Sequence, residues 1–581
     1  MQRVRLGLAW ARSRVLLVAR ASAGVAGFAG VLGCTSPGDG VEETAGACEY
    51  YDTLYVSEEG ISLLSGSCGT LRLRDPEILG EGVFELEWYT DGATTLPVVR
   101  ALTPDAVLYG LRLRGEIDLF GASALRVRGL PSHSGTTEPE VRSGLTGGGW
   151  FERPGEASLV VGAVTARTSA FQVSVTPGGF LEAEWSLGRG GRALVEGESF
   201  YLDPVAGAFG PDASELWQVY VDRVAQSSGA PAELAPSASG WVGDMPSFET
   251  WDEVFAPLAS YAKTREERQV VVLTAARDGA PWDVGSLADA LEAGLDDLIV
   301  REKQRQVTVG LRWSPFSVAS EAAVGEGWVL DANGATLATD GMAFVDVTHA
   351  AGRERLEAAA AVLADTGVEW VELDRLWAAS VDGVRARSIS PQEAFGEALR
   401  LVRDRLPGVS LVGVEAPILE SSGHVDGLRL TTMPPRSASA QRVSLGPTHG
   451  VLWSVMTSAI GTDTPSGWAS AEGAFVSWAS LPGGLWRWGF DTTGYDPKYE
   501  AWQNDAEVSR PRGYREGARA DGTVIVDGDG FVAYLNPTAD AATFPSAQGE
   551  EYCSGASPEA SGEEVDSLEG ELWVVSESES R

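Results

Sequence analysis

The chain has 581 residues, of which 44% are hydrophobic, enough to build several packed domains. Its 82 acidic residues outnumber 44 Lys and Arg, which gives a net charge of −38 and argues against nucleic acid as a partner. The four His and four Cys show no metal-ligand spacing, so we expect neither a metal site nor a cofactor.

The first 34 residues have the features of an export signal. Four Arg residues form a basic start, and an apolar stretch of small residues runs over 15–33. It closes on Val31-Leu32-Gly33-Cys34, which resembles a bacterial lipobox with Cys34 acylated; a simple signal peptide is the alternative. Removal of residues 1–33 leaves 39 Lys and Arg against 82 acids, a net charge of −43. We expect an exported lipoprotein, periplasmic or at the cell surface, held to the membrane by its lipid.

Residues 35–48 are rich in Gly, Pro, Ser and acids and indicate a tether, and residues 49–235 indicate a β-sandwich domain. Short runs with period-two alternation, such as 83–88 and 171–175, are separated by Gly-rich turns, which is typical of antiparallel sheets. We expect Gly147-Gly148-Gly149 to form a loop between strands. A helix is predicted over 213–225.

Cys48 and Cys68 flank a strand-rich stretch and are candidates for a disulfide in an oxidising compartment. Cys553 would then be left over. The sequence alone leaves this pairing open.

Residues 236–510 change rhythm, because strand-like apolar runs now alternate with helical ones. Two of the predicted helices cover 353–364 and 391–405. Eight strand-like runs are expected, over 240–242, 270–273, 307–311, 368–371, 409–415, 425–430, 452–456 and 485–488. This alternation predicts a parallel (β/α)8 TIM barrel.

Residues 511–581 return to strands, at 523–526 and 531–535, and predict a small C-terminal β-domain with a loose acidic tail.

The fourth barrel strand carries the most informative residue. An amphipathic helix and the short loop Asp365-Thr366-Gly367 precede it, and Asp374 follows its end. A parallel barrel places catalytic groups at the C-terminal ends of its strands. Asp374 is therefore a candidate nucleophile, although an ordinary strand-end Asp is the alternative.

Four sequence blocks, in this order, carry a resemblance to a known family. The block 311–316 is similar to Gly-Ile-Trp-x-x-Pro-Phe, 345–350 to Leu-Asp-x-Thr-His-Pro, 372–374 to Lys-Leu-Asp, and 423–429 to Gly-Leu-Val-Asp-Gly-Met-Arg. As a set they resemble the α-galactosidases of glycoside hydrolase family 36. The resemblance implies a multidomain fold: an N-terminal β-supersandwich, a central barrel and a small C-terminal β-domain.

The resemblance also implies a retaining mechanism on an α-linked galactoside or a related sugar, with two carboxyl groups. Asp374 aligns with the nucleophile. Met433 occupies the position of the acid/base, and a Met side chain transfers no proton. Glu415, which ends the next strand, is a speculative substitute; the alternative is that it is solvated.

Five further positions are implied to bind substrate. Glu372 replaces a Lys that donates to a sugar hydroxyl, so it is either a compensating acid or a residue that points away from the site. Arg429 is a candidate ion-pair partner of Asp374 or Asp426. Asp278 and Trp241 belong to altered versions of the family's Asp-Asp-Gly and Gly-Trp-Cys-Ser-Trp motifs. Trp313 either stacks on a sugar ring or fills the core. The five positions are Trp241, Asp278, Trp313, Glu372 and Arg429.

These departures fall where the sugar would bind, whereas the strands of the barrel are retained. Two hypotheses follow. The chain is either a diverged glycoside hydrolase with Asp374 as nucleophile, or a non-catalytic carbohydrate-binding or scaffold lipoprotein that kept the fold.

Overall fold

The computed structural model describes most of residues 47–430 and a set of strands after them. The described ranges are 47–119, 126–129, 145–153, 156–175, 180–228, 238–244, 268–274, 294–414, 416–430, 454–458, 485–489, 515–518, 524–528, 531–536, 542–543, 550–554, 564–565 and 569–574.

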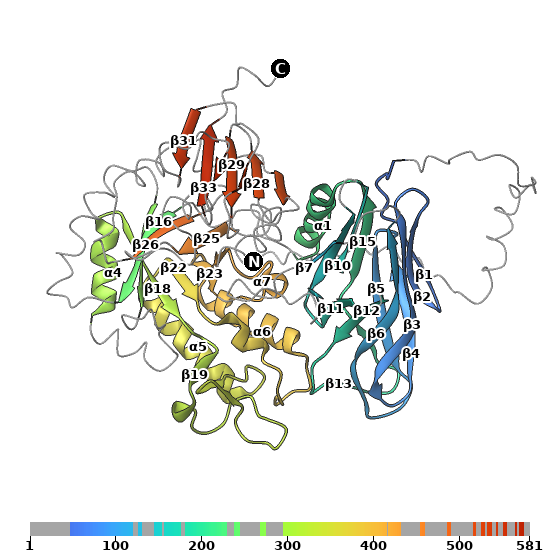
Figure 1. Ribbon diagram of the computed structural model, residues 1–581. Helices are drawn as coiled ribbons and strands as arrows, with labels where there is room; N and C mark the ends of the chain where they lie inside the picture. The colour runs from blue at the N-terminus through green and yellow to red at the C-terminus, as the bar shows by residue number, and fades with distance from the viewer. Residues whose placement is uncertain are drawn as a thin grey trace, which may run out of the picture. The chain divides into compact units, whose positions relative to one another are not determined.

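Two antiparallel sheets form the β-sandwich (Figure 1). The first sheet contains β1 (Leu54–Ser57), β2 (Gly60–Ser65), β3 (Gly69–Glu81), β6 (Ala106–Leu119), β8 (Leu145–Thr146), β11 (Ala170–Val175), β12 (Phe180–Ser186) and β13 (Arg192–Leu194). The second contains β4 (Phe84–Thr90), β5 (Thr94–Ala101), β7 (Arg126–Gly129), β9 (Gly148–Arg153), β10 (Ala157–Ala163), β14 (Ser199–Tyr201) and β15 (Val205–Gly210).

Strand β12 illustrates why this sequence forms a sandwich. Leu181, Ala183 and Trp185 are buried in the core, while Glu182 and Glu184 alternate with them on the outer face. Arg112 of the neighbouring strand β6 forms ion pairs with both acids. The period of two therefore separates an apolar layer from a charged one.

The glycine run expected as a loop lies mostly within a strand. Gly148 opens β9 and pairs with Gly162 of β10. The reason is close packing against helix α1 (Ala213–Ser228): the Tyr220 hydroxyl donates to the carbonyl of Ala163 at 2.6 Å, and a Cβ at Gly162 would lie 2.6 Å from that hydroxyl. Burial raises the pKa of Tyr220. A Cβ at Gly148 would lie 2.7 Å from the Gly162 Cα and 3.3 Å from the Tyr220 hydroxyl, so glycine at this position allows β10 and α1 to approach closely.

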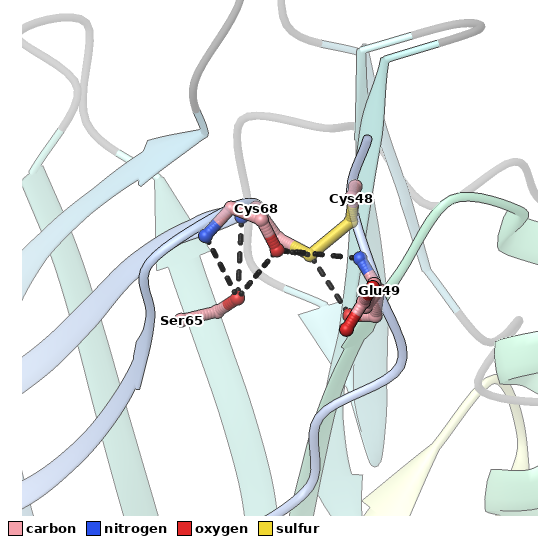
Figure 2. The surroundings of a disulfide bond; sticks show 5 residues. Cys48, Glu49, Ser65 and Cys68 are labelled. Atoms are coloured by element: carbon pink, nitrogen blue, oxygen red, sulfur yellow. Dashed lines mark hydrogen bonds between the residues drawn. A yellow bond between two sulfur atoms is a disulfide. The ribbon is translucent and has the colours of Figure 1, made fainter. Parts of the chain in front are cut away.

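Cys48 and Cys68 form a disulfide, which settles the question that the sequence left open (Figure 2). Their Cα atoms are 4.6 Å apart, and the bond joins the entry of β1 to the turn between β2 and β3. The Ser65 hydroxyl accepts a hydrogen bond from the Cys68 backbone N–H at 3.2 Å. The start of the sandwich is thereby covalently closed.

Eight parallel strands close into a barrel, and each overlaps one of the expected runs. They are β16 (Ala238–Asp244), β17 (Arg268–Thr274), β18 (Val307–Trp313), β22 (Trp370–Leu373), β23 (Ser410–Val414), β24 (Gly427–Leu430), β25 (Ser454–Ser458) and β26 (Leu485–Gly489). The complete alternation with helices stays a prediction, because several connections lie outside the described residues.

The described connections between barrel strands contain helical elements. They include α4 (Leu295–Gln304), α5 (Ala350–Asp365), α6 (Pro391–Arg405), the short α7 (Ile418–Ser421) and the 3-10 turn η3 (Leu376–Ser380). Helix α6 begins at a capping box, in which Ser390 accepts from the Glu393 N–H and the Glu393 carboxylate accepts from the Ser390 N–H.

A small sheet and a 3-10 turn are inserted between β18 and α5. The elements are β19 (Ser317–Ala319), η2 (Ser320–Ala322), β20 (Ala338–Thr339) and β21 (Met342–Phe344).

Successive residues of β22 face the two sides of the barrel wall. Val371 and Leu373 belong to the hydrophobic core that also holds α5 and α6. Trp370 has the opposite orientation and lies against Gly310 of β18, where a Cβ would stand 2.9 Å from the indole. The barrel interior at this level is filled by Trp370, as expected for a packed barrel rather than a pore.

A five-stranded antiparallel sheet lies near the C-terminus, in the order β27-β28-β29-β33-β31. Its strands are β27 (Arg515–Ala518), β28 (Val524–Gly528), β29 (Phe531–Asn536), β31 (Glu550–Ser554) and β33 (Glu569–Val574); β30 (Ala542–Thr543) pairs with β32 (Glu564–Val565). The expected loose tail is therefore wrong for β31 and β33. The many Glu residues obscured the strand pattern, but pairing on both edges satisfies the backbone of β33.

Within the described part of the chain, none of the helices is both long and apolar enough to cross a membrane.

Candidate active site

Asp374 follows the C-terminal end of β22. Its backbone N–H donates to the Trp313 carbonyl at 2.8 Å, which continues the pairing between β18 and β22 by one residue. Its carboxylate Oδ1 accepts a hydrogen bond from Arg312 Nη2 at 3.1 Å. The side chains are 3% and 16% exposed for Asp374 and Arg312, so this is a largely enclosed ion pair.

Arg312 and Glu372 are register partners on the adjacent strands β18 and β22. Because side chains alternate along a strand, Trp370, Glu372 and Asp374 share the interior face of β22 in successive layers. Glu372 is fully buried one layer below Asp374. It therefore shares the face of the nucleophile candidate, although it has no exposed surface with which to meet a substrate.

The turn after Asp374 has a constrained backbone. Arg375 has a φ of 51° and lies in the left-handed region, which is uncommon for residues other than Gly and Asn. The chain then enters η3, where Trp377 contacts Phe344 of β21 with ring centroids 5.7 Å apart. The strand end that holds Asp374 is thus supported by the inserted sheet.

Asp346 ties two loops together. It accepts from the Thr348 N–H and hydroxyl, and from the Ala386 N–H 40 residues later. His349 caps α5, with its Nδ1 accepting from the Ala351 N–H at 3.1 Å. Both residues therefore have structural roles.

Trp313 corrects the sequence interpretation. It is fully buried among the core residues on the outer side of the strands, with Leu311 and Leu373. It follows an inward-facing Arg312, so alternation turns the indole away from the barrel interior. Trp313 fills the core, and its assignment as a sugar-stacking residue is wrong.

Several predicted residues have side chains outside the described part. Cys34, Asp278, Glu415 and Met433 lie outside it altogether. The backbones of Trp241 and Arg429 pair within β16 and β24, so the structure gives their strand positions alone.

The two acids considered as partners of Arg429 are each engaged elsewhere. Asp374 is bonded to Arg312, and Asp426 accepts from Arg403 at 2.8 Å near the start of β24.

Arg312 was missed by the sequence reasoning. The available signal was a cation between Leu311 and Trp313 in a mostly apolar strand. A charged residue inside a buried strand is normally paired.

Among the described residues, no group of three or more His, Cys, Asp or Glu has the arrangement of a metal site.

No protein-family model matches the chain, and no curated protein matches it in sequence. Solved structures do match. An α-galactosidase from Thermus thermophilus, in complex with p-nitrophenyl α-D-galactopyranoside, is 15% identical with a TM-score of 0.51, covering 77% of this chain and 98% of its own. A variant of the family 36 α-galactosidase AgaA from Geobacillus stearothermophilus, in complex with 1-deoxygalactonojirimycin, is 13% identical with a TM-score of 0.54, covering 90% and 89%. An α-galactosidase from Lactobacillus brevis is 11% identical with a TM-score of 0.53, covering 90% and 89%.

The chain has a fold similar to that of the family 36 α-galactosidases. At 11–15% identity, this similarity concerns the fold and leaves the chemistry to the residues of the site.

Proposed function

We propose that this protein is a diverged glycoside hydrolase that acts on an α-linked galactoside or a related sugar by a retaining mechanism, with Asp374 as the nucleophile. The observation that carries the proposal is the carboxylate of Asp374 at the C-terminal end of the fourth barrel strand, held by Arg312. An enzyme of this type attacks the anomeric carbon with one carboxylate and protonates the departing oxygen with another group.

The general acid/base residue is the part of the proposed mechanism that has no clear counterpart in this chain. With Met433 at the expected position, the loss of general acid catalysis costs on the order of 10²–10⁴ in rate. Glu415 remains the proposed substitute. Trp241, Asp278, Glu372 and Arg429 remain proposed as residues that shape the substrate site.

A substrate with a good leaving group tests the nucleophile without the acid. Asp374 would displace p-nitrophenolate from p-nitrophenyl α-D-galactopyranoside and form a β-linked galactosyl ester. Azide, which needs no general base, would then displace the carboxylate and give α-galactosyl azide. We expect azide to accelerate p-nitrophenolate release by the mature chain, and Asp374→Asn to abolish both products.

The matched control is Asp404→Asn, the same chemical change at an exposed position of α6. It should leave release unchanged. Release that survives in Asp374→Asn, or azide product of the β configuration from the unaltered chain, would reject Asp374 as the nucleophile.

The second candidate function is carbohydrate binding without hydrolysis. It is favoured by the enclosure of the Asp374–Arg312 pair, because a working nucleophile needs access to substrate. Saturable binding of the galactoside, measured by calorimetry, together with no p-nitrophenolate release and no azide product, would favour this candidate over the hydrolase.

We also propose export and acylation of Cys34, and the domain division near residues 235 and 510. The Cys48–Cys68 disulfide supports export, because such bonds persist in oxidising compartments. The mass of the mature amino terminus checks the acylation: a chain that begins at Cys34 and carries acyl groups is expected, and an unmodified start would exclude it.

A further inference from the structure

The two oxygens of the Asp374 carboxylate are not equivalent. Oδ1 accepts from Arg312 Nη2, and among the described residues Oδ1 is the only one of the two oxygens with a hydrogen-bond partner. An oxygen that accepts a hydrogen bond from a guanidinium is a poorer nucleophile than one that does not. The hydrogen bond occupies a lone pair and stabilises the negative charge on that oxygen. The geometry thus distinguishes an oxygen anchored by Arg312 from one that has no hydrogen-bond partner among the described residues.

The position of Arg312 is fixed by the barrel rather than by the surface. Its Cα is paired in register with Glu372, and the residue below it on the same face of β18 is Gly310, which packs against Trp370. The filled interior leaves the guanidinium directed toward the strand end, where Asp374 lies. A flexible surface pair would not hold one oxygen in this way.

We propose that Arg312 is a positioning residue that anchors Asp374 through Oδ1 and assigns Oδ2 to the attack on the anomeric carbon. This inference rests on the proposed function and adds a residue to it. Arg312 acts through Asp374 and does not itself touch the sugar.

The proposal makes the two chemical steps unequal. In the first step Oδ2 forms a bond to the anomeric carbon, the bond to p-nitrophenolate breaks, and Oδ1 becomes the carbonyl oxygen of the ester. In the second step azide attacks, or water attacks and releases a proton to the solvent; the bond from the anomeric carbon to Oδ2 breaks, and its electron pair returns to the carboxylate. Arg312 stabilises this returning charge, so it favours the second step and opposes the first.

The test is Arg312→Gln in the full mature chain, with p-nitrophenyl α-D-galactopyranoside. Loss of a charge-assisted hydrogen bond to the departing carboxylate should lower kcat by about ten- to hundredfold. KM should fall with kcat, because the galactosyl ester accumulates. A burst of p-nitrophenolate equal to the enzyme concentration, and a galactosyl adduct on the Asp374 peptide by mass spectrometry, should accompany this.

Arg312→Lys should restore part of kcat, because an ammonium still donates to Oδ1. The matched control is Arg403→Gln, which breaks the ion pair with Asp426 near the opposite ends of the strands and should leave the balance between the two steps unchanged. If Arg312→Gln does not fold, as judged by its thermal transition, Arg312→Lys carries the test with a smaller fall in kcat and KM.

Two failures are distinguishable. If the unaltered chain forms an ester on Asp374 but the Arg312 variants show no greater accumulation, or lose kcat/KM and kcat equally, the role of Arg312 is overturned and the nucleophile stands. If no variant and no unaltered protein forms an ester, the proposed function itself fails, and this inference fails with it.

Discussion

Asp203 is the most densely bonded carboxylate of the sandwich. It is buried and accepts from the backbone N–H groups of the consecutive residues Arg167, Thr168 and Ser169, and from three hydroxyl groups. The hydroxyls belong to Thr165, Thr168 and Ser169. One charge thereby organises the whole connection between β10 and β11.

Asp203→Asn should lower the free energy of unfolding by about 3 kcal/mol. The N–H and O–H donors around residue 203 would lose a charged acceptor, and the NH₂ group of the new Asn would point its own hydrogens at some of these donors. Urea unfolding measures the change. Asp91→Asn is the control, since Asp91 accepts from two backbone N–H groups in an exposed turn and should cost less than about 1 kcal/mol. Equal losses for the two variants would contradict this account of Asp203.

Of the two residues in the Asp374–Arg312 ion pair, only Asp374 could be predicted from the sequence. Asp374 was predictable, because it directly follows a buried strand and a motif surrounds it. Arg312 was not, since its partner lies 62 residues away and only the register of β18 against β22 brings them together. Trp313 was misassigned because the sequence did not show which face of β18 points into the barrel; the inner face proved to be the one that carries Gly310 and Arg312.

Among the helical elements, α7 and the turn after it carry two half-buried ionisable groups, Glu420 and His424, whose pKa values are shifted in opposite directions. Burial raises the pKa of Glu420 to about 7, and the nearby Asp203 adds to the rise. Burial lowers the pKa of His424 to about 4, helped by the positive charges of Arg400, Arg167 and Arg403. Both groups are therefore favoured in their neutral forms by the fold.

The stability that Glu420 contributes should be lost as pH rises. The unfolded chain releases this proton near the usual pKa of 4.5, whereas the folded chain holds it until about pH 7. Glu420→Gln cannot ionise, so its stability relative to the unaltered protein should rise by about 2 kcal/mol between pH 4.5 and 7.5.

Urea unfolding across this pH range measures the difference. The contribution of His424 has the opposite sign, since it is present above pH 6.5 and lost as pH falls toward 4, but it is common to both proteins and cancels. Glu354→Gln, the same chemical change at an exposed position of α5, is the matched control. A stability difference for Glu420→Gln that does not vary with pH would exclude a neutral Glu420 carboxyl in the folded protein.

Elements were predictable where local chemistry marks their ends. Helix α6 begins and ends at the expected residues, because Ser390, Pro391 and Glu393 form an unmistakable start. Strands β31 and β33 were missed, because their Glu residues resemble an unstructured acidic tail and their stability comes from pairing with distant strands. Gly148 was misread for a related reason, since the elements that pack closely against it, strand β10 and Tyr220 of α1, come later in the chain.

For the whole molecule, the rhythm of apolar runs was enough to place the eight strands of the barrel, whereas the likeness to the family 36 fold was implied by the four motif blocks. The same rhythm says nothing about which side chains face the site. The barrel could therefore be predicted from the periodicity of the apolar runs, whereas the Asp374–Arg312 ion pair became evident only in the three-dimensional structure.

The disulfide should stabilise the chain as a whole. It closes a segment of 20 residues, for which loss of unfolded-state entropy predicts about 3 kcal/mol. A double Cys48→Ser, Cys68→Ser variant should unfold at lower urea by that amount, and a reductant should bring the unaltered protein to the same midpoint. Cys553→Ser, as control, should keep the response to reductant; equal midpoints for the double variant and the oxidised protein would contradict the prediction.

The place of β33 inside the C-terminal sheet has a consequence for shortened chains. Because β33 pairs with β29 on one side and β31 on the other, a chain that stops before residue 569 loses an interior strand rather than an edge. Two rows of unsatisfied amide and carbonyl groups would then face solvent and recruit other chains. Premature stops there should yield aggregates, and so should carboxy-terminal fusions that prevent β33 from inserting.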